Sequence, residues 1–216
     1  MICISVGDRS VPRVQSVLRA QRCVELRLDL IRPNDEALQS LFRPSRTIIA
    51  TCRPGRLSPA QRRDLLIRAI GLGASYVDIE ITARPALREA ILRASRRYGC
   101  RVIFSYHNHR TTPRTTVLES IVRRAFSAGA DVVKVACQVR EPADNVRLLT
   151  LLQHQRWRRR LIIIGMGHRG RITRIVAPLL GSRFAFVRAE RMRATAPGQL
   201  TSRELKAAWN SLRRKR

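Results

Sequence analysis

Lys134 is the residue of this chain whose surroundings most clearly indicate chemistry. It lies in the segment 131–137, Asp-Val-Val-Lys-Val-Ala-Cys, which otherwise reads as a buried β-strand. A charged amine inside such a strand is costly unless a partner compensates it. The chain has forty arginines and only three lysines, Lys134, Lys206 and Lys215. A buried lysine can lose its proton and become a nucleophile, whereas arginine cannot, so Lys134 is either a covalent catalyst or an amine paired to an acid at a strand end.

His107 ends another apolar run and provides Lys134 with a partner for acid–base chemistry. A lysine can form an iminium with a ketone, and a neighbouring imidazole can remove the proton α to that carbon and later act as an acid. A carboxylate on the preceding apolar run, Asp78 or Glu80, can hold the imidazole in one tautomer. The other histidines lack such a setting and are expected in loops or at the surface: His109, His154 and His168.

Eight apolar strand candidates, separated by amphipathic and arginine-rich helical segments, are available to position these residues. Strict alternation predicts a parallel sheet covered by helices. Eight repeats without a Gly-x-Gly-x-x-Gly fingerprint favour a closed (β/α)8 TIM barrel over an open doubly wound sheet. No linker interrupts the pattern, so residues 1–216 are expected to form a single domain. The strand candidates are 2–6, 23–30, 47–53, 76–81, 101–107, 131–137, 161–167 and 184–189, and the clearest helical segments are 59–71, 85–98, 115–128 and 144–153.

The period of two along each strand predicts which side chains face the barrel interior. Alternate residues point inward and the others pack against the helices. In the segment 23–30 the apolar positions Val24, Leu26, Leu28 and Leu30 form the outer face. The polar positions of five consecutive strands then point inward: Glu25, Arg27, Asp29, Thr51, Arg53, Asp78, Glu80, Ser105, His107 and Lys134. Interior barrel layers are normally aliphatic, so these residues predict an organised site, although pairs such as Arg27 with Asp29 also have a purely structural reading.

The net charge of +28 makes nucleic acid a competing ligand. The arginines are scattered through every segment, with dense groups only at 156–160 and 213–216, and few aromatic residues are present for base stacking. A solvated arginine-rich surface is therefore favoured, with only non-specific binding of nucleic acid. No apolar run approaches the roughly eighteen residues needed to span a bilayer, and no signal-peptide pattern opens the sequence. Five cysteines without a Cys-x-x-Cys pair argue against a zinc site and indicate a reducing, cytoplasmic compartment.

The motifs, in their order along the chain, resemble those of the type I 3-dehydroquinate dehydratases. Each motif is short, but together they extend over nearly the whole chain and fall at the predicted strand ends. The matching segments are Glu25-Leu-Arg27-Leu-Asp29, Thr51-Cys-Arg53, Ser105-Tyr-His107-Asn-His-Arg-Thr-Thr112-Pro113, Asp131-Val-Val-Lys134-Val-Ala, Met166-Gly167-His-Arg-Gly170-Arg-Ile-Thr173-Arg174 and Thr195-Ala196-Pro197-Gly198-Gln199.

This resemblance implies a hydro-lyase of the shikimate pathway that eliminates water in the syn sense from 3-dehydroquinate to give 3-dehydroshikimate. It implies that Lys134 forms a Schiff base with the substrate ketone and that His107 is the general acid and base. It also implies that Arg174 holds the substrate carboxylate. No metal or diffusible cofactor is implied, and homodimers are usual in the family. The remaining substrate-binding residues implied are Glu25, Arg27, Arg53, Thr195 and Gln199.

Three positions depart from the family pattern. Thr173 and Thr195 replace serines and keep the hydroxyl group. The turn Pro54-Gly-Arg56-Leu57 replaces an acidic, glycine-rich one, which changes the expected contacts to the substrate hydroxyls. Two alternatives stay open at this point. One is another Schiff-base barrel, of the class I aldolase type, which would not require the carboxylate clamp at Arg174, and the other is a nucleic-acid-binding barrel.

Overall fold

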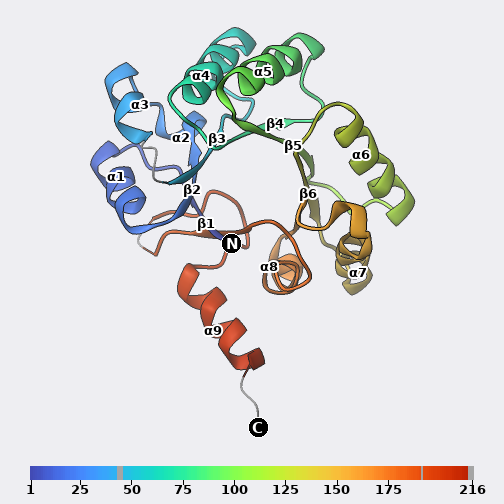
Figure 1. Ribbon diagram of the computed structural model, residues 1–216. Helices are drawn as coiled ribbons and strands as arrows, with labels where there is room; N and C mark the ends of the chain where they lie inside the picture. The colour runs from blue at the N-terminus through green and yellow to red at the C-terminus, as the bar shows by residue number, and fades with distance from the viewer. Residues whose placement is uncertain (43–45, 191, 214–216) are drawn as a thin grey trace.

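The computed structural model describes residues 1–42, 46–190 and 192–213 of the chain. Eight strands run parallel in one sheet and alternate with helices, which lie outside the ring of strands (Figure 1). The predicted (β/α)8 barrel is confirmed. The strands are β1 (Ile2–Val6), β2 (Cys23–Arg27), β3 (Thr47–Thr51), β4 (Tyr76–Glu80), β5 (Arg101–Asn108), β6 (Val132–Gln138), β7 (Leu161–Met166) and β8 (Ala185–Arg188).

The helices fill the connections between the strands. The predicted helix at 59–71 is present, and it begins with a capping box in which Ser58 accepts from the backbone of Gln61 and the Gln61 side chain accepts from the backbone of Ser58. No helix of the described residues has the length and apolar character needed to cross a bilayer. The α-helices are α1 (Val11–Ala20), α2 (Leu28–Ile31), α3 (Asp35–Leu41), α4 (Pro59–Gly71), α5 (Pro85–Tyr98), α6 (Thr115–Ser127), α7 (Pro142–Thr150), α8 (Arg171–Val176) and α9 (Ser202–Arg213), and the 3-10 helices are η1 (Leu151–Gln153), η2 (Gln155–Trp157) and η3 (His168–Gly170).

The strand order has β7 and β8 at its two ends, and two hydrogen bonds next to these strands nearly close the barrel. The backbone N–H of Arg183 donates to the carbonyl of Leu161 at 2.7 Å. Ser182 contributes its hydroxyl oxygen, which accepts from the backbone N–H of Ile163 at 3.2 Å. These two bonds join the ends of the sheet just before β8 begins.

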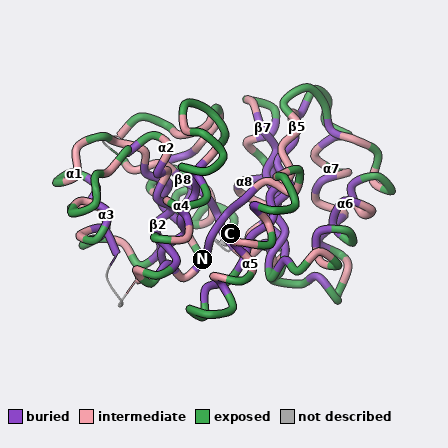
Figure 2. The backbone as a smooth tube through the Cα atoms, turned by 90° about the horizontal axis from the view of Figure 1, so that it is seen from above, coloured by how far each residue is buried: buried purple, intermediate pink, exposed green. Residues whose placement is uncertain are grey.

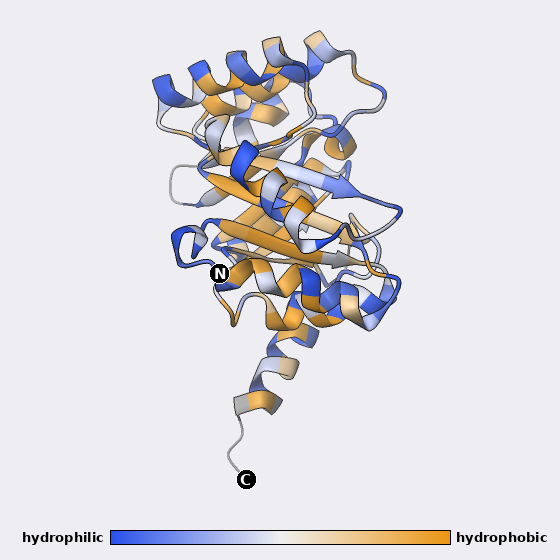
Figure 3. Ribbon diagram, turned by 90° about the vertical axis from the view of Figure 1, so that its right-hand side faces the viewer, coloured by the Kyte–Doolittle hydropathy of each residue, from blue (hydrophilic) through white to orange (hydrophobic). Residues whose placement is uncertain are grey.

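Two apolar cores result from the alternation along the strands. The larger core lies between the sheet and the helices and contains outward-facing residues such as Val24, Leu26, Val133 and Val135. The buried strands and exposed outer helix surfaces are visible in Figure 2, and the apolar strands with polar helix surfaces in Figure 3. The smaller core fills the barrel interior with Cys3, Cys23, Ile49, Tyr76, Ile103, Val132, Ala136, Ile162, Ile164, Met166, Phe184 and Phe186.

The strand predicted at 23–30 is too long. β2 ends at Arg27, whose partner Thr51 is also the last residue of β3, so no neighbouring backbone extends the ladder further. The chain turns there into the short helix α2, and Leu30 is partly exposed rather than part of an outer strand face. Asp29 therefore lies outside the strand, and the prediction that it projects into the barrel is wrong. It folds back onto Arg27, which donates two hydrogen bonds to it at 3.0 and 2.7 Å.

The strands predicted at 47–53 and 76–81 also end earlier, at Thr51 and Glu80. Arg53 is therefore a loop residue immediately after β3. The helix predicted at 144–153 begins two residues earlier as α7, and its last part becomes η1. These shifts move element boundaries but leave the order of strands and helices as predicted.

Candidate active site

Lys134 points into the barrel, as its position in β6 predicts. Its neighbours Val133 and Val135 face the outer core, which leaves the amine on the inner side. The Lys134 Nζ atom donates to Asp78 Oδ2 at 3.1 Å and lies 3.6 Å from Glu25 Oε1. It also lies 4.4 Å from the ring centroid of Phe186, which forms one wall around the amine. The residue is 5% exposed, so the amine is held by carboxylates and an aromatic face rather than by bulk water.

Arg53 connects β3 to the carboxylates of β4. Its guanidinium contacts Asp78 Oδ2 at 2.9 Å and Glu80 Oε1 at 2.6 Å, and it donates to Ser105 Oγ at 2.7 Å. Ser105 in turn donates to Asp78 Oδ1 at 2.7 Å. Burial alone would raise the pKa of Asp78, but the positive charges of Arg53 and Lys134 outweigh it and hold that pKa far below the ordinary value. Asp78 is therefore a fully buried, ionised carboxylate.

His107 contacts Glu80 and not Asp78. The sequence had left both carboxylates open as the one that orients the His107 ring. Its Nδ1 atom lies 3.0 and 3.1 Å from the two Glu80 carboxylate oxygens. Because an ionised carboxylate can only accept, this contact places a proton on Nδ1 and leaves Nε2 unprotonated in the neutral ring. Burial lowers the pKa of His107, and the charge of Arg53 lowers it further, while the hydrogen bond to Glu80 partly opposes the shift. The neutral imidazole is thus favoured.

Glu25 forms the opposite side of the cage around Lys134. Thr51 donates to its Oε1 at 3.0 Å, and the hydroxyl of Ser5 donates to its Oε2. Burial would raise the pKa of Glu25, but the charge of Lys134 is among the influences that lower it. Ser5 was not among the site residues expected from the sequence. A signal for it exists, because Ser5 is the one polar residue in the apolar run of β1 and lies two positions from inward-facing Cys3.

A loop after β8 covers the cavity. Gln199 Oε1 accepts from the backbone N–H of Thr195 at 2.9 Å and from its hydroxyl at 3.2 Å. The Thr195 hydroxyl also lies 2.6 Å from Ser5 Oγ, and Arg27 donates to the Thr195 carbonyl at 3.2 Å. The side-chain oxygen of Gln199 is therefore hydrogen-bonded within the loop, and Arg27 is hydrogen-bonded to the loop and to Asp29.

Arg174 enters the cavity from α8, and no carboxylate of the described residues pairs with it. It is 6% exposed, its Nη2 donates to the Pro197 carbonyl at 3.2 Å, and its buried Nε has no hydrogen-bond partner among the described residues. Burial and the nearby charge of Arg171 lower the pKa of Arg174 to about 10. A buried guanidinium with a free donor is suited to binding an anion.

The predicted site residues line one cavity of about 70 Å³, apart from Asp78 and Glu80, which stand behind it. Asp29 is the one predicted inward residue that the structure places elsewhere. No group of three or more His, Cys, Asp or Glu side chains among the described residues is arranged to hold a metal ion. Ala136, Ile164, Met166 and Phe186 add apolar walls. The eight predicted residues at the cavity are Glu25, Arg27, Arg53, His107, Lys134, Arg174, Thr195 and Gln199.

The remaining histidines lie outside the cavity lining, as predicted. His109 and His168 are exposed. His109 nevertheless stacks beside His107, with ring centroids 6.1 Å apart. His154 is partly buried between Trp157 and Glu119, whose carboxylate lies 2.9 Å from its Nε2.

A family model described as type I 3-dehydroquinase matches residues 2–216. The chain belongs to this family. Among relatives of this type I 3-dehydroquinase, the 3-dehydroquinate dehydratase of Pyrococcus abyssi is 33% identical over 189 residues, which are 84% of this chain and 83% of that protein. The 3-dehydroquinate dehydratase of Methanococcus maripaludis strain C5 is 31% identical over 217 residues, 95% of this chain and 97% of that protein.

Solved structures agree with this type I 3-dehydroquinase assignment. The 3-dehydroquinate dehydratase from Geobacillus kaustophilus superposes with a TM-score of 0.86 at 25% identity, covering 98% of this chain and 90% of that chain. The enzyme of the same name from Aquifex aeolicus gives 0.82 at 25% identity, with 100% of both chains covered. The predicted enzyme class, a hydro-lyase of the type I dehydroquinase family, is confirmed, and the aldolase alternative loses its support.

Proposed function

We propose that this type I 3-dehydroquinase removes water from 3-dehydroquinate in the syn sense through a Schiff base on Lys134, with His107 as the general acid and base. The observation that carries the proposal is the position of the Lys134 amine. It lies inside the barrel, 3.1 Å from Asp78, and lines the same cavity as His107 of the adjacent strand. A nucleophilic amine and a neutral imidazole in one enclosed cavity are the two groups that this elimination requires.

The reaction begins with the Lys134 amine attacking the C3 ketone. The carbonyl oxygen leaves as water, and the new C=N bond is an iminium that withdraws electrons from C2. His107 Nε2 then takes the C2 proton, and the C–H electron pair moves into the iminium to give an enamine. The enamine expels the C1 hydroxyl, which takes the proton from His107 and leaves as water. Water finally hydrolyses the product iminium and releases 3-dehydroshikimate and free Lys134.

The carboxylates around Lys134 have distinct roles in this proposal. Asp78 and Glu25 balance the positive charge that the Lys134 nitrogen carries once it is part of an iminium. Neither carboxylate bonds to the reacting carbon. Glu80 holds the His107 ring through Nδ1, so that Nε2 faces the substrate. The lowered pKa of His107 supplies the neutral base at physiological pH.

Arg174 is proposed to bind the substrate carboxylate. Its unpaired Nε and its buried charge are both satisfied by a carboxylate that accepts from two guanidinium nitrogens. Glu25, Arg27 and Arg53 line the part of the cavity that would receive the hydroxyl groups. A planar guanidinium at position 174 therefore fixes the direction of the substrate ring relative to Lys134.

Substrate entry requires the loop after β8 to move. The cavity, of about 70 Å³, is lined on one side by Thr195, Ala196 and Gln199 of this loop. Thr195 and Gln199 close this cavity and are held by Ser5 and by hydrogen bonds within the loop. We infer that the loop opens, admits substrate and closes again, which excludes water from the iminium.

The decisive test is reductive trapping. Borohydride added with 3-dehydroquinate should attach a reduced ligand to the peptide that contains Lys134, seen as a mass shift, and Lys134→Met should show neither the shift nor the enone absorbance of 3-dehydroshikimate. His107→Ala should still trap ligand but lose turnover, because imine formation needs the amine and elimination needs the base. Turnover by Lys134→Met above background would reject the Schiff base.

Three further expectations stay predictions: that residues 1–216 act as a single domain, that the protein is a homodimer, and that it is cytoplasmic. Light scattering of the purified protein tests the second. A monomer at micromolar concentration that retains full turnover would contradict it.

A further inference from the structure

Arginines gather at the end of the barrel where the strands begin, opposite the cavity. In a parallel barrel, all residues that lead into the strands lie at this end. Among the first residue of each strand and the two before it, the described residues include six arginines and one acid, Asp131. The acid is occupied locally, because its Oδ2 accepts from the Val102 N–H at 2.7 Å. The six arginines are Arg22, Arg46, Arg101, Arg159, Arg160 and Arg183.

These arginines lack the carboxylate partners found elsewhere on the molecule. Among the described residues, none of the six lies within 4.0 Å of a carboxylate, and several bond only to neutral oxygens, such as Arg46 to the Arg19 carbonyl at 2.9 Å and Arg183 to the Tyr76 hydroxyl at 2.8 Å. Some arginines on the outer helix surfaces do have such partners. The exposed residues Arg13, Arg63 and Arg93 each pair with an acid: Asp8, Asp64 and Glu89. The six arginines of the strand-start end are therefore not compensated by ion pairs among the described residues.

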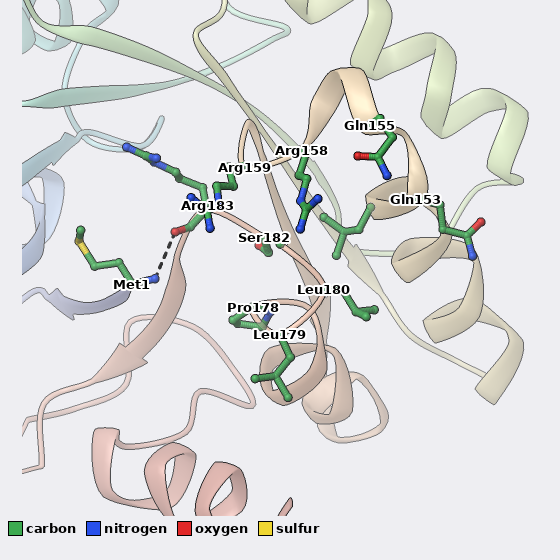
Figure 4. A pocket seen from close by; sticks show the side chains of 12 residues that line it. Met1, Gln153, Gln155, Arg158, Arg159, Pro178, Leu179, Leu180, Ser182 and Arg183 are labelled. Carbon is green, nitrogen blue, oxygen red and sulfur yellow. Dashed lines mark hydrogen bonds between the residues drawn. The ribbon is translucent and has the colours of Figure 1, made fainter. Parts of the chain in front are cut away.

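The same end is hollowed. A cavity of about 630 Å³ is lined by Arg158, Arg159 and Arg183, and none of the described residues that line it is acidic (Figure 4). The backbone of Arg159 is left-handed, with φ of 58°, and its N–H donates to the Gly181 carbonyl at 3.2 Å, which fixes the arginine-rich loop beside the turn before β8. The exposed side chains of Leu179 and Leu180 supply an apolar wall.

We propose that this strand-start face binds the phosphodiester backbone of single-stranded nucleic acid. The arginines are distributed around the barrel, at or just before the starts of β2, β3, β5, β7 and β8, so an extended polyanion matches them better than a compact one. Guanidinium groups bind phosphate through paired hydrogen bonds. The hollow with its apolar wall accepts an unstacked base, which a duplex does not offer. This face is distant in the fold from Lys134, so the inference is independent of the proposed dehydration.

A pair of variants with equal charge tests the location. Arg22, Arg158 and Arg159 are exposed, and no side-chain hydrogen bond or ion pair of theirs is present in the described structure, so their joint replacement by glutamine leaves the packing unchanged. Arg13→Gln/Arg63→Gln/Arg93→Gln is the control, with the same loss of three charges on the helix surfaces. Binding is measured by fluorescence anisotropy with labelled oligouridylate over a range of salt concentrations, and turnover of 3-dehydroquinate is measured for both.

The strand-start variant should bind oligouridylate about tenfold more weakly, and the slope of log K against log salt should fall in magnitude by about 2, since each lost contact to a single strand releases about 0.7 fewer counterions. The control should retain both the affinity and the slope, and turnover should be unchanged in the two proteins. Equal losses in both variants would show that binding depends only on net charge and would overturn the proposal. Tighter binding to anionic phosphatidylserine vesicles than to oligouridylate, lost in the same variant, would assign the face to membranes instead.

Discussion

Arg174 is a buried cation that the protein alone does not neutralise. Its Nε lacks a partner among the described residues, and burial lowers its pKa to about 10. A buried charge without a counter-ion destabilises the empty protein and is compensated only when an anion binds. Binding and stability should therefore respond in opposite directions when this charge is removed.

Arg174→Met should stabilise the ligand-free protein by about 1 kcal/mol, because an unpaired buried charge is replaced by an apolar chain. It should also raise KM for 3-dehydroquinate by about 10- to 100-fold through loss of a charge-assisted contact. Urea unfolding and steady-state kinetics measure the two effects. Arg96→Met is the control, because Arg96 is exposed on α5 and its replacement should change neither by much. A less stable Arg174→Met protein would mean that the charge is already compensated.

Glu80 sets the protonation of His107. Its hydrogen bond raises the pKa of the imidazole, while burial and the charge of Arg53 lower it, and the net shift is downward. The acidic limb of the pH profile of kcat/KM should therefore lie below about 6.5, the ordinary histidine value. Glu80→Gln weakens the hydrogen bond and removes the negative charge that raise the pKa of His107, so the limb should move to still lower pH.

Glu80→Gln should also lower kcat, because the amide holds the Nδ1 proton less firmly than a carboxylate. The exposed Glu89→Gln serves as the control and should leave the profile in place. Movement of the acidic limb to higher pH in Glu80→Gln would show that the contact with Glu80 does not raise the pKa of His107.

At the scale of the element, Arg174 depends on how closely β7, η3 and α8 pack. A Cβ atom on Gly165 would lie only 2.8 Å from Gly170 Cα, so both positions require glycine. Thr173 fastens this approach, because its hydroxyl accepts from the Gly165 N–H at 2.7 Å and donates to the Gly170 carbonyl at 2.8 Å. The threonine found where the family has serine thus holds β7 and η3 together next to Arg174.

Thr173→Ala should cost about 1–3 kcal/mol of stability, since the Gly165 N–H is left buried without a partner. It should raise KM more than it lowers kcat, because α8 carries Arg174, which we propose binds the substrate carboxylate, but not the proposed reacting groups. Thr173→Ser keeps the hydroxyl and should remain close to the wild type in both. Chemical denaturation and kinetics of the three proteins provide the measurements, and equal stability of the serine and alanine variants would refute the role of the hydroxyl.

The directions of the strand side chains were predictable from the sequence, whereas the strand ends were not. Alternation is a local property, so Glu25, Lys134 and His107 face inward as expected. The apolar spacing of Leu28 and Leu30 continues that of a strand, but β2 stops where its partner β3 stops, which only the tertiary structure determines. Periodicity likewise cannot tell whether Asp78 or Glu80 contacts His107, because both lie on the same face of β4. The distance from each carboxylate to the imidazole decides it.

Helix α3 shows the complementary case. A helical segment was expected between the second and third strands, but its bounds were not given. Its start nevertheless carries a local signal, because the Asn34 side chain accepts from the Ala37 N–H at 2.9 Å and Asp35 and Glu36 follow the cap. The helix has only seven residues, too few for a clear apolar period. Capping residues would have been the better evidence for it.

At the scale of the whole molecule, charge divides between the two ends of the barrel. The end with the cavity holds ionised carboxylates balanced by buried cations. Among the described residues that lead into the strands at the opposite end, six arginines stand against one acid, Asp131. The sequence shows the arginines as scattered, because their gathering at one end depends on where each strand begins. A basic protein of net charge +28 therefore contains an active-site cavity whose local charges nearly cancel.

Acid should unfold the protein through this carboxylate network. Asp78 has a lower pKa folded than unfolded, so its ionised form stabilises the fold. That contribution is complete above the unfolded value of about 3.9 and is lost as pH falls through the folded value. Asp78→Asn should lower the unfolding free energy by about 3 kcal/mol at neutral pH, and the difference from the wild type should shrink as pH falls below about 4.

Unfolding by urea between neutral pH and about pH 2 separates this effect from general repulsion among the cations. Added salt screens the repulsion between exposed arginines and should recover part of the acid loss in both proteins, but it should not alter the difference between them, because Asp78 is fully buried. Asp64→Asn, at an exposed position, should follow the wild type at every pH. A difference between wild type and Asp78→Asn that is independent of pH would mean that Asp78 is not ionised in the fold, and the charge balance proposed around Lys134 would have to be abandoned.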